Sequence, residues 1–381
     1  MSQCDYAIVH RSFWPESEII GESLLQLAEK LVKQSSVVTI IQGDQNFFKV
    51  LNAASRGKGV CFDISKSRSN SASSILSRGL DAILFSLSVG VSLLKRRPKK
   101  IYVSTDPPIF VPFVVALYSL IFNARFVYHL QDIHPEATSL VSNRIGVFFG
   151  LLKWIDSISV RSAKKIITLT DEMAEYISSR NQIKKEEIFL IENAAVVSND
   201  VQSVIRKPGI VFVGNLGRLQ RIPLIIKAIR KYRSERGELP FFFAGGGVYS
   251  SDIEKLAGEV TDFTYLGKIS AVEANRIQKQ FTWALLPIED KVLNFAFPSK
   301  TSTYLVNGIN ILSVSKSNSS VSNWVKRREV GFNSEPNEKS IVDAFFQIEK
   351  STDFVPDNIR TVDCYSISAH VNQLLKTMIS I

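Results

Sequence analysis

Short apolar runs rich in β-branched and aromatic residues alternate with longer segments of helical periodicity through the first half of the chain. In the segment 21–33, Leu24, Leu27, Ala28 and Leu31 recur at the spacing of a helix with one buried face. The strand candidates are 6–9, 37–41, 59–64, 101–104, 126–130, 166–169 and 188–191. This alternation predicts a parallel sheet covered by helices on both faces.

The segment 193–208 interrupts the alternation and predicts a linker between two domains. The pattern then restarts, with strand candidates at 210–213, 241–243, 263–266, 284–287 and 311–314. We expect an α/β protein with two doubly wound, Rossmann-like domains, over 1–195 and 209–365. They are joined by a linker over 196–208 and followed by a helix over 366–381 that packs back on the first domain. Because parallel sheets bind ligands at the carboxyl ends of their strands, a cleft between the domains is the expected site.

The composition is that of a globular protein. Of 381 residues, 45% are hydrophobic and 22% are charged, which excludes wholesale disorder and collagen-like or coiled-coil repeats. Cys4, Cys61 and Cys364 match neither a disulfide framework nor a zinc-ligand spacing, so a reducing cytosol is expected. The N-terminal residues lack the pattern of a secretory signal. The longest apolar run, 109–122, is shorter than the roughly 20 residues of a spanning helix and predicts a buried core helix.

The formal net charge of +10 is concentrated in the segment 56–100, which holds ten Lys and Arg residues against two Asp residues. An anionic partner is therefore expected, such as a lipid surface or a phosphorylated substrate. Nucleic acid is disfavoured, because the basic segment lacks interleaved aromatic residues and no recognition motif is present. The apolar segment 73–94 fits either an amphipathic helix on anionic lipid or an ordinary sheet-covering helix.

Three segments of the second half are suited to binding phosphate. Gly214, Gly217 and Arg218 lie between a strand and a helix, where small residues let backbone N–H groups approach an anion. The glycines at 245–247 follow the next strand and indicate a close backbone approach to a ligand, or else a loose turn. Neither segment has the glycine spacing and following acidic residue of a nicotinamide dinucleotide site.

The third segment is Pro298-Ser299-Lys300. Proline can begin a helix and serine can cap it, which directs the helix N-terminus toward an anion. A lysine in the first turn is unfavourable against the helix dipole unless a phosphate binds there. Together the three segments indicate a nucleotide diphosphate bound by backbone amides, Arg218 and Lys300.

In the first half, the segment 128–136 places His129, Asp132, His134 and Glu136 at the end of a strand. The two histidines with Asp132 could hold a metal ion, but a polar loop is the stronger interpretation. The chain contains no Asp-x-Asp sequence, which disfavours a pyrophosphate clamped by a metal ion.

In these segments the chain resembles the GT-B glycosyltransferases, particularly the retaining family-4-type enzymes of bacterial surface polysaccharide assembly (O-antigen, capsule or exopolysaccharide). Residues 13–16 with Gly21 resemble the loop where the acceptor approaches. Residues 131–136 resemble the Gln-Asp-x-x-Pro-Glu segment of the family. Residues 214–218 resemble its phosphate-binding turn, and Pro298-Ser299-Lys300 with Tyr304 resembles its donor-site helix.

The resemblance implies residue roles. The residues expected to bind the acceptor are Trp14, Glu16, Gly21 and His134. Donor binding falls to Gly214, Asn215, Gly217, Arg218, Arg221, Gly245, Gly246, Pro298, Ser299, Lys300, Thr301, Thr303 and Tyr304. The catalytic set is Asp132 and Glu136, which orient hydroxyl groups, and Arg218 and Lys300, which stabilise the leaving diphosphate. In many relatives two glutamates occupy the positions of Phe295 and Thr303, so ribose recognition must differ here.

The implied activity is a metal-independent transfer, without a cofactor, from a nucleotide sugar, with UDP-sugar the first expectation. The implied acceptor is a polyprenyl-diphosphate-linked saccharide, reached by a cytoplasmic protein bound peripherally to the anionic inner face of the membrane. Two alternatives stay open. One is a GT-B-type sugar-nucleotide epimerase, and the other is a non-catalytic sugar-nucleotide-binding subunit of a transferase complex.

Overall fold

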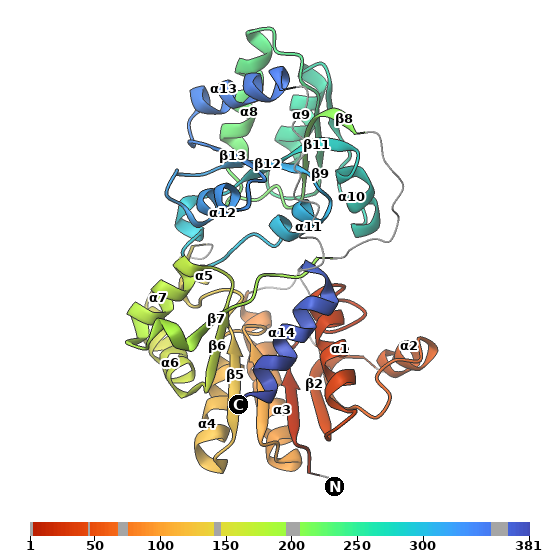
Figure 1. Cartoon of the computed structure of the whole chain (residues 1–381), viewed down its shortest axis with the longest axis vertical. Helices are drawn as coiled ribbons and strands as arrows, with labels where there is room; N and C mark the ends of the chain where they lie inside the picture. The colour runs from red at the N-terminus through yellow and green to blue at the C-terminus, as the bar shows by residue number, and fades with distance from the viewer. Residues whose placement is uncertain (1–2, 45, 68–74, 141–145, 196–205, 352–364) are drawn as a thin grey trace. The chain divides into compact units, whose positions relative to one another are not determined.

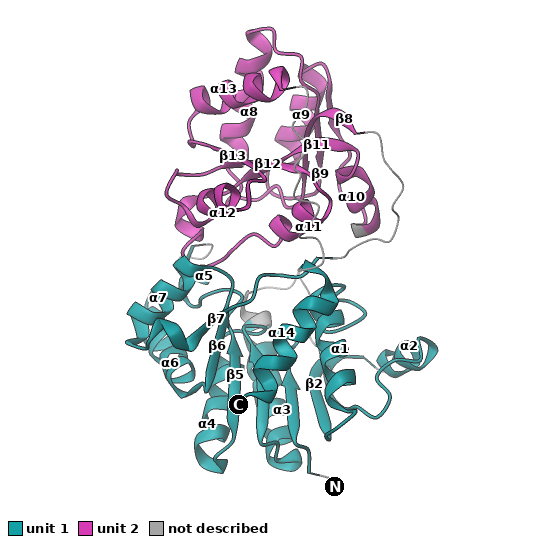
Figure 2. Ribbon diagram, in the orientation of Figure 1, with its two compact units in different colours: residues 1–196, 364–381 teal, residues 197–363 magenta. Residues whose placement is uncertain are grey.

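The computed structural model describes residues 3–44, 46–67, 75–140, 146–195, 206–351 and 365–381, which form two compact units (Figure 2). The first unit comprises Met1–Val196 and Cys364–Ile381, and the second comprises Val197–Asp363. The main chain therefore leaves the first unit, builds the second and returns. Most of the segment predicted as a linker, 196–205, lies outside the described residues.

The first unit is built on a parallel sheet (Figure 1). Its strands are β1 (Tyr6–Val9), β2 (Val37–Gly43), β3 (Cys61–Lys66), β4 (Lys100–Ser104), β5 (Arg125–His129), β6 (Lys165–Thr168) and β7 (Ile188–Leu190). Their order is β3-β2-β1-β4-β5-β6-β7. The order reverses between β1 and β4, and such a switch point is where sheets of this kind bind ligands.

Helices cover both faces of this sheet. They are α1 (Ile20–Leu31), α2 (Phe47–Ala53), α3 (Ile75–Arg96), α4 (Phe110–Phe122), α5 (Glu136–Ser139), α6 (Phe149–Ser162), α7 (Asp171–Asn181) and α14 (Ile367–Ile379), with a 3-10 turn η2 (Lys185–Glu187). On one face α1 and α14 lie side by side (Figure 1), and their Leu24, Ala28 and Leu374 pack into one core with Ile8 and Val127 of the sheet.

The other face is covered by α3, α4 and α6. Tyr128, which alternates with Val127 along β5, donates a hydrogen bond to Asp156 of α6 at 2.8 Å. Neighbouring residues of a strand point to opposite faces, so α6 lies opposite α14. In sequence order α3 packs against α4 and α4 against α6.

The second unit repeats the architecture with a six-stranded parallel sheet. Its strands are β8 (Lys207–Val213), β9 (Phe241–Ala244), β10 (Phe263–Tyr265), β11 (Phe281–Pro287), β12 (Asn310–Val314) and β13 (Gly331–Ser334), in the order β10-β9-β8-β11-β12-β13. Its helices are α8 (Ile222–Ser234), α9 (Ser250–Glu259), α10 (Ala271–Gln278), α11 (Lys300–Val306), α12 (Ser320–Arg328) and α13 (Glu338–Lys350), with a 3-10 turn η3 (Asp290–Val292). Phe212, Phe241, Phe243 and Phe345 lie in its core.

Three details differ from the sequence predictions. The edge strand β13 was not predicted, because its sequence Gly-Phe-Asn-Ser has neither an apolar run nor β-branched residues. Strand β8 begins at Lys207, inside the segment predicted as a linker. Helix α4 is not wholly buried, because Leu120 and Ile121 near its end are 66% and 73% exposed. No described helix combines the length and the hydropathy that crossing a membrane requires.

Candidate functional site

The turn after β8 has a backbone conformation that favours glycine. Gly214 has a φ of +147°, and a Cβ atom there would overlap with the Lys300 side chain. Two backbone hydrogen bonds to the end of β9 and the turn after it hold this turn in place. They run from Gly214 N to Ala244 O and from Leu216 N to Gly246 O, each 2.9 Å. The glycine therefore allows a lysine side chain to lie directly against the backbone of the turn.

A second glycine turn follows β9 and packs against the first. A Cβ atom on Gly245 would overlap with the carbonyl oxygen of Gly214, and one on Gly247 with that of Leu216. The sequence indicated a close approach of this backbone to a ligand. In the structure these glycines are explained by contact between the two turns.

Asn215 and Gly217 complete the first turn. Asn215 is exposed, whereas Gly217 is buried, with its Cβ position 2.9 Å from Asn215 Nδ2. A side chain at position 217 would therefore displace the asparagine amide, so the two residues fit together as a pair.

Lys300 is a partly buried cation of this unit. Its Nζ lies 4.2 Å from the centroid of the Phe212 ring, and burial lowers the pKa of the ammonium group to about 8. Among the residues that the structure describes, no carboxylate pairs with it. A diphosphate bound at the glycine turn would supply the missing negative charge.

Helix α11 carries Lys300 in its first turn but is not capped as predicted. Ser299 occupies the N-cap position in helical conformation, and its hydroxyl makes no capping hydrogen bond. Thr301 Oγ1 instead donates to Pro298 O at 2.7 Å. Tyr304 is fully buried, so its side chain anchors the helix in the interior of the unit.

Phe295 and Thr303 hold the positions at which many relatives carry glutamates. Phe295 lies in the loop before α11 and Thr303 within it, and both are partly buried. Neither side chain has a carboxylate, so these two positions offer no negative charge to offset Lys300.

The two predicted arginines differ. Arg218 is exposed at the end of the glycine turn. The guanidinium of Arg221 donates from Nε to Ile288 O at 2.8 Å and pairs with Asp290 Oδ2 at 2.6 Å and Glu289 Oε2 at 3.4 Å. It fixes the start of α8 to the loop after β11, so the expectation of a phosphate-facing Arg221 is not met by its contacts.

Lys268 is a cation that the sequence interpretation missed. It follows β10, and the Cβ position of Gly246 lies 2.5 Å from its Cε atom. Its side chain is exposed and covers the second glycine turn. The signal was present in the sequence, because a strand followed by glycine and a basic residue occurs after both β8 and β10.

In the first unit, residues 131–136 follow β5. Burial raises the pKa of Asp132 to about 6, and its backbone N–H donates to Thr105 Oγ1 at 3.5 Å. His134 Nδ1 lies 2.7 Å from Thr138 Oγ1, and burial lowers its pKa to about 4. Both groups are therefore shifted toward their uncharged forms.

His129 does not join them, because it is fully buried with Nδ1 2.7 Å from the hydroxyl of Tyr102. In the part of the chain that the structure describes, no three His, Cys, Asp or Glu side chains are arranged to hold a metal ion.

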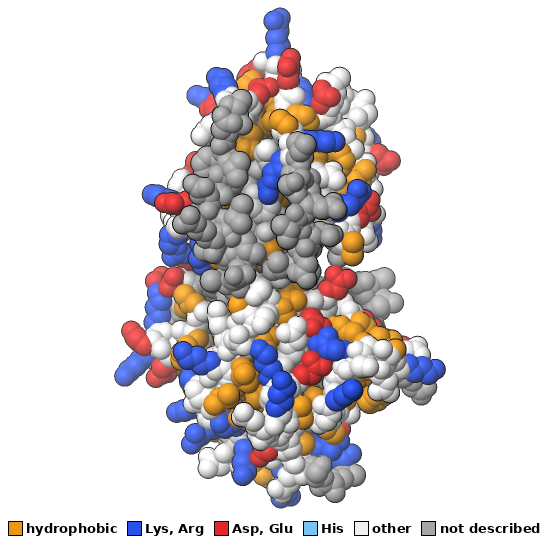
Figure 3. All heavy atoms as spheres, turned by 45° about the vertical axis from the view of Figure 1, so that its right-hand side comes forward, with side chains coloured by type: hydrophobic (Ala, Val, Ile, Leu, Met, Phe, Trp, Pro, Cys, Tyr) orange, Lys and Arg blue, Asp and Glu red, His pale blue; other side chains and the backbone are white. Residues whose placement is uncertain are grey.

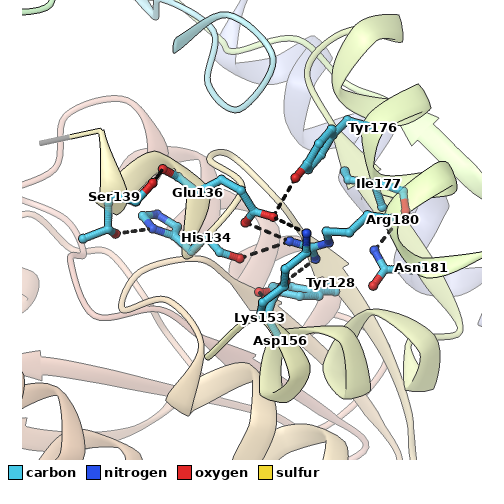
Figure 4. Close-up of polar contacts among 11 residues, drawn as sticks. Tyr128, His134, Glu136, Ser139, Lys153, Asp156, Tyr176, Ile177, Arg180 and Asn181 are labelled. Atoms are coloured by element: carbon cyan, nitrogen blue, oxygen red, sulfur yellow. Dashed lines mark hydrogen bonds and ion pairs between the residues drawn. The ribbon is translucent and has the colours of Figure 1, made fainter. Parts of the chain in front are cut away.

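Glu136 is the centre of a buried ionic network (Figure 4). Its carboxylate accepts hydrogen bonds from Arg180 Nη1 at 3.1 Å and from the Tyr176 hydroxyl at 2.8 Å. It also forms an ion pair with Lys153 Nζ at 3.6 Å. Arg180 also pairs with Asp156 and donates to His134 O at 3.2 Å. The side chains of Glu136, Arg180 and Asp156 are each at most 5% exposed.

This network corrects the role expected for Glu136. Protein donors already occupy both oxygens of its carboxylate. Through Arg180 it fixes the backbone at His134, so Glu136 is a positioning residue for the loop that carries Asp132. Sequence reasoning missed Arg180 and Asp156, which lie on α7 and α6 and follow no motif.

The predicted acceptor loop lies against the start of α1. The Cβ position of Gly21 is 2.5 Å from Trp14 N and 2.6 Å from Phe13 C, so only a residue without a side chain lets the loop pack there. Arg56 lies 5.9 Å from the Trp14 ring centroid, and Glu16 is exposed.

Asp106, after β4, is a further acidic group that sequence reasoning did not single out. Its carboxylate pairs with Arg11 at 2.7 Å and lies 3.6 Å from Nδ1 of buried His10. The nearby positive groups hold the pKa of Asp106 below its usual range despite burial. Because β1 and β4 flank the switch point, these residues lie at the edge where the first unit would bind a ligand.

Comparison with solved structures establishes the fold. The Anabaena protein Alr3699/HepE, solved in complex with UDP, superposes with a TM-score of 0.67 at 12% identity, covering 100% of both chains. The chain has the GT-B fold. The UDP-GlcNAc 2-epimerase of Methanocaldococcus jannaschii has the same fold, with a TM-score of 0.62 at 10% identity over 99% of both chains.

Sequence comparison adds one curated relative. The chain is 24% identical over 296 residues to the probable glycosyltransferase WbjE of Pseudomonas aeruginosa, covering 73% of this chain and 72% of the relative. No family model matches the sequence.

Proposed function

We propose that the protein is a metal-independent, retaining glycosyltransferase that moves a sugar from a UDP-sugar to a lipid-linked glycan in cell-surface polysaccharide biosynthesis. The observation that carries this proposal is Lys300, a partly buried cation that lies against a glycine turn and pairs with no carboxylate among the described residues. The similarity to WbjE and to a UDP-bound GT-B structure supports the same activity.

In this proposal the donor diphosphate binds at the turn of Gly214 and Gly217. Lys300 and Arg218 stabilise the negative charge that develops on the leaving diphosphate. A preorganised cation in a site shielded from water is suited to this role, because it needs no reorganisation during the reaction. Lys268 is an additional candidate for the donor phosphates, since it covers the neighbouring turn.

The first unit binds the acceptor in this proposal. Asp132 orients a hydroxyl group, and Trp14, Glu16 and His134 contact the saccharide. By resemblance, the acceptor is a polyprenyl-diphosphate-linked saccharide at the anionic cytoplasmic face of a membrane. The departing phosphate takes the acceptor proton, so no dedicated general base is required.

Thermal unfolding with UDP-, GDP-, dTDP- and CMP-sugars in the presence of EDTA tests the donor assignment. A ligand that binds only the folded state raises the free energy of unfolding by roughly 2.7 kcal/mol at 100 times its Kd. We expect stabilisation by UDP-sugars that Lys300→Ala abolishes. The control is Lys255→Ala, which removes an exposed lysine of α9.

Turnover separates this function from its alternatives. A transferase releases UDP much faster when acceptor is added, whereas an epimerase converts the donor without acceptor. Stabilisation by a donor without turnover under either condition would identify a non-catalytic binding subunit. Absence of stabilisation by every nucleotide would contradict the proposed site.

A further inference from the structure

Helix α3 is apolar on the side that faces away from the sheet. Its outward residues recur three or four positions apart between positions 80 and 94. They are Leu80, Ile83, Leu87, Val91 and Leu94, which are 60%, 44%, 61%, 65% and 54% exposed. Phe85, Val89 and Leu93 fill its buried side. A sheet-covering helix normally turns charged or polar residues to solvent, so this helix has a second apolar face without a partner in the described structure.

The neighbouring helices extend the exposed apolar area. Helix α4 packs against both α3 and α6. The exposed apolar residues of this pair are Leu117, Leu120, Ile121 and Phe122 on α4, with Val147, Phe148, Leu151 and Trp154 on and just before α6. We call these residues and the five outward residues of α3 the α3–α4–α6 surface. Large exposed apolar areas are rare on soluble monomers and mark interaction sites.

The charged side chains that these three helices expose are basic. The three helices contain only two acidic residues, Asp81 and Asp156, and both are buried. At the end of α3 and α4, Arg97 lies 5.9 Å from the centroid of the Phe122 ring, with exposed Lys95 and Lys99 nearby in sequence. The surface is therefore apolar with a basic border.

Another face of the same unit is different. On the side turned forward in Figure 3, acidic and basic side chains lie next to one another over the region of α1. Arg56 pairs there with Glu22 at 3.0 Å and with Glu29 at 2.9 Å. The absence of acidic side chains from the outward faces of α3, α4 and α6 is thus not a general property of the unit.

We propose that the α3–α4–α6 surface docks onto an anionic lipid bilayer. The outward side chains enter the boundary between headgroups and acyl chains, and the basic residues pair with lipid phosphates. A second copy of the chain is a poorer occupant, because two such surfaces would bring their basic borders together without acidic partners. This inference deepens the proposed function, whose lipid-linked acceptor is held in a membrane.

Vesicle flotation of the full-length protein tests the docking. The probes are phosphatidylcholine vesicles with and without phosphatidylglycerol. We expect binding to the mixed vesicles, lowered about tenfold by the triple substitution Leu87→Gln, Val91→Gln and Leu94→Gln. The matched control is Val272→Gln on α10, which changes a valine that is 77% exposed in the other unit. Binding of the triple variant at the level of the control would overturn the proposal.

Trp154 gives an independent measurement that needs no loss of binding. It is 60% exposed, whereas Trp14 is partly buried and Trp283 and Trp324 are 4% and 3% exposed. Lipids brominated on the acyl chains should quench part of the tryptophan fluorescence, and Trp154→Phe should remove most of that quenching. Equal quenching in Trp154→Phe would contradict insertion of α6. Self-association that the triple substitution abolishes, without vesicle binding by the wild type, would assign the surface to a second copy.

The basic border makes a separate contribution. Arg97→Gln with Lys99→Gln should remove the preference for anionic vesicles while leaving weak binding that salt does not change, because screening acts on exposed charges and not on apolar contact. An unchanged preference would overturn the role of the border.

Donor stabilisation measured on the triple variant separates the two proposals. It should equal that of the wild type, which also shows that the variant is folded. Vesicle binding without stabilisation by any donor in the wild type would contradict the proposed function and leave the docking surface in place. Stabilisation of the wild type by a donor, without vesicle binding, would contradict the docking surface and leave the proposed function in place.

Discussion

The two units differ in whether the charged side chains at the carboxyl ends of their sheets have partners of opposite sign. In the first unit, Arg180 lies between Glu136 and Asp156, and each of these three buried charges has a partner of opposite sign within the protein. In the second unit, Lys300 lies over an aromatic ring and beside a glycine turn, with no carboxylate partner among the described residues.

The paired charges of the first unit are suited to holding a loop in place, whereas the unpaired charge of the second is suited to binding a ligand. A network that is already neutralised holds its loop in place whether or not a ligand is present. A buried ammonium group without a counter-charge lowers the stability of the empty protein and favours an anion when one binds. The first arrangement therefore positions Asp132, and the second is suited to a diphosphate.

The largest effect is expected from breaking the neutralised network. Arg180→Met would leave two buried carboxylates without their shared cation, which should lower the free energy of unfolding by about 3–5 kcal/mol. Urea denaturation measures this change. The matched control is Arg230→Met, which removes an ion pair with Glu259 whose side chains are about half exposed and should change stability by about 0–1 kcal/mol. Equal losses for the two variants would show that burial does not distinguish these pairs.

A smaller effect of opposite sign is expected at Lys300. Its pKa in the folded protein, about 8, lies below the ordinary 10.5, so the unfolded state binds the proton more tightly. Below pH 8 the charged lysine therefore lowers stability, and this penalty disappears as pH rises from about 8 to 10.5. Lys300→Met should raise the free energy of unfolding by on the order of 1–3 kcal/mol at pH 7 without ligand.

The pH series decides whether this gain comes from the ammonium charge. The difference between Lys300→Met and the wild type should shrink toward pH 10. A gain of the same size at both pH values would instead assign it to packing of the methionine.

The sequence predicts the sheets better than it predicts these networks. Strand and helix alternation is local, and it places all strands except β13, whose Gly-Phe-Asn-Ser sequence has weak β-propensity. The glycines and Lys300 were found because they break local rules of backbone conformation and helix charge. Arg180 lies 44 positions after Glu136, and only the packing of α7 against the start of α5 brings the pair together.

The same limit explains the two arginines of the donor turn. Arg218 and Arg221 are both cations in the segment that the sequence predicts to bind phosphate. Asp290, which holds Arg221, comes from a loop 69 positions away. Which arginine is exposed and which is occupied depends on that distant loop, so the local sequence could not separate them.

The smallest effect is expected at Asp132. Its pKa in the folded protein, about 6, lies above the ordinary 3.8, so the folded state favours the protonated form. The stability that this preference contributes is present below about pH 4 and lost as pH rises through 6. Asp132→Asn should therefore stabilise the protein by on the order of 1 kcal/mol at pH 7 and leave its stability unchanged below pH 4. Denaturation at pH 7 and pH 3.5 checks this, and stabilisation of equal size at both values would exclude ionisation as its cause.

Helix α14 has a consequence for the order in which the chain acquires its structure during synthesis. Its Val371, Leu374 and Met378 belong to the same core as Leu24 of α1, yet they are translated after the entire second unit. The second unit is one uninterrupted segment and can fold as soon as it leaves the ribosome. The first unit, although it begins the chain, must wait with the α1 side of its core uncovered until α14 emerges. Removing α14 would therefore damage the opposite end of the sequence, exposing apolar residues of α1 to chaperones and proteases.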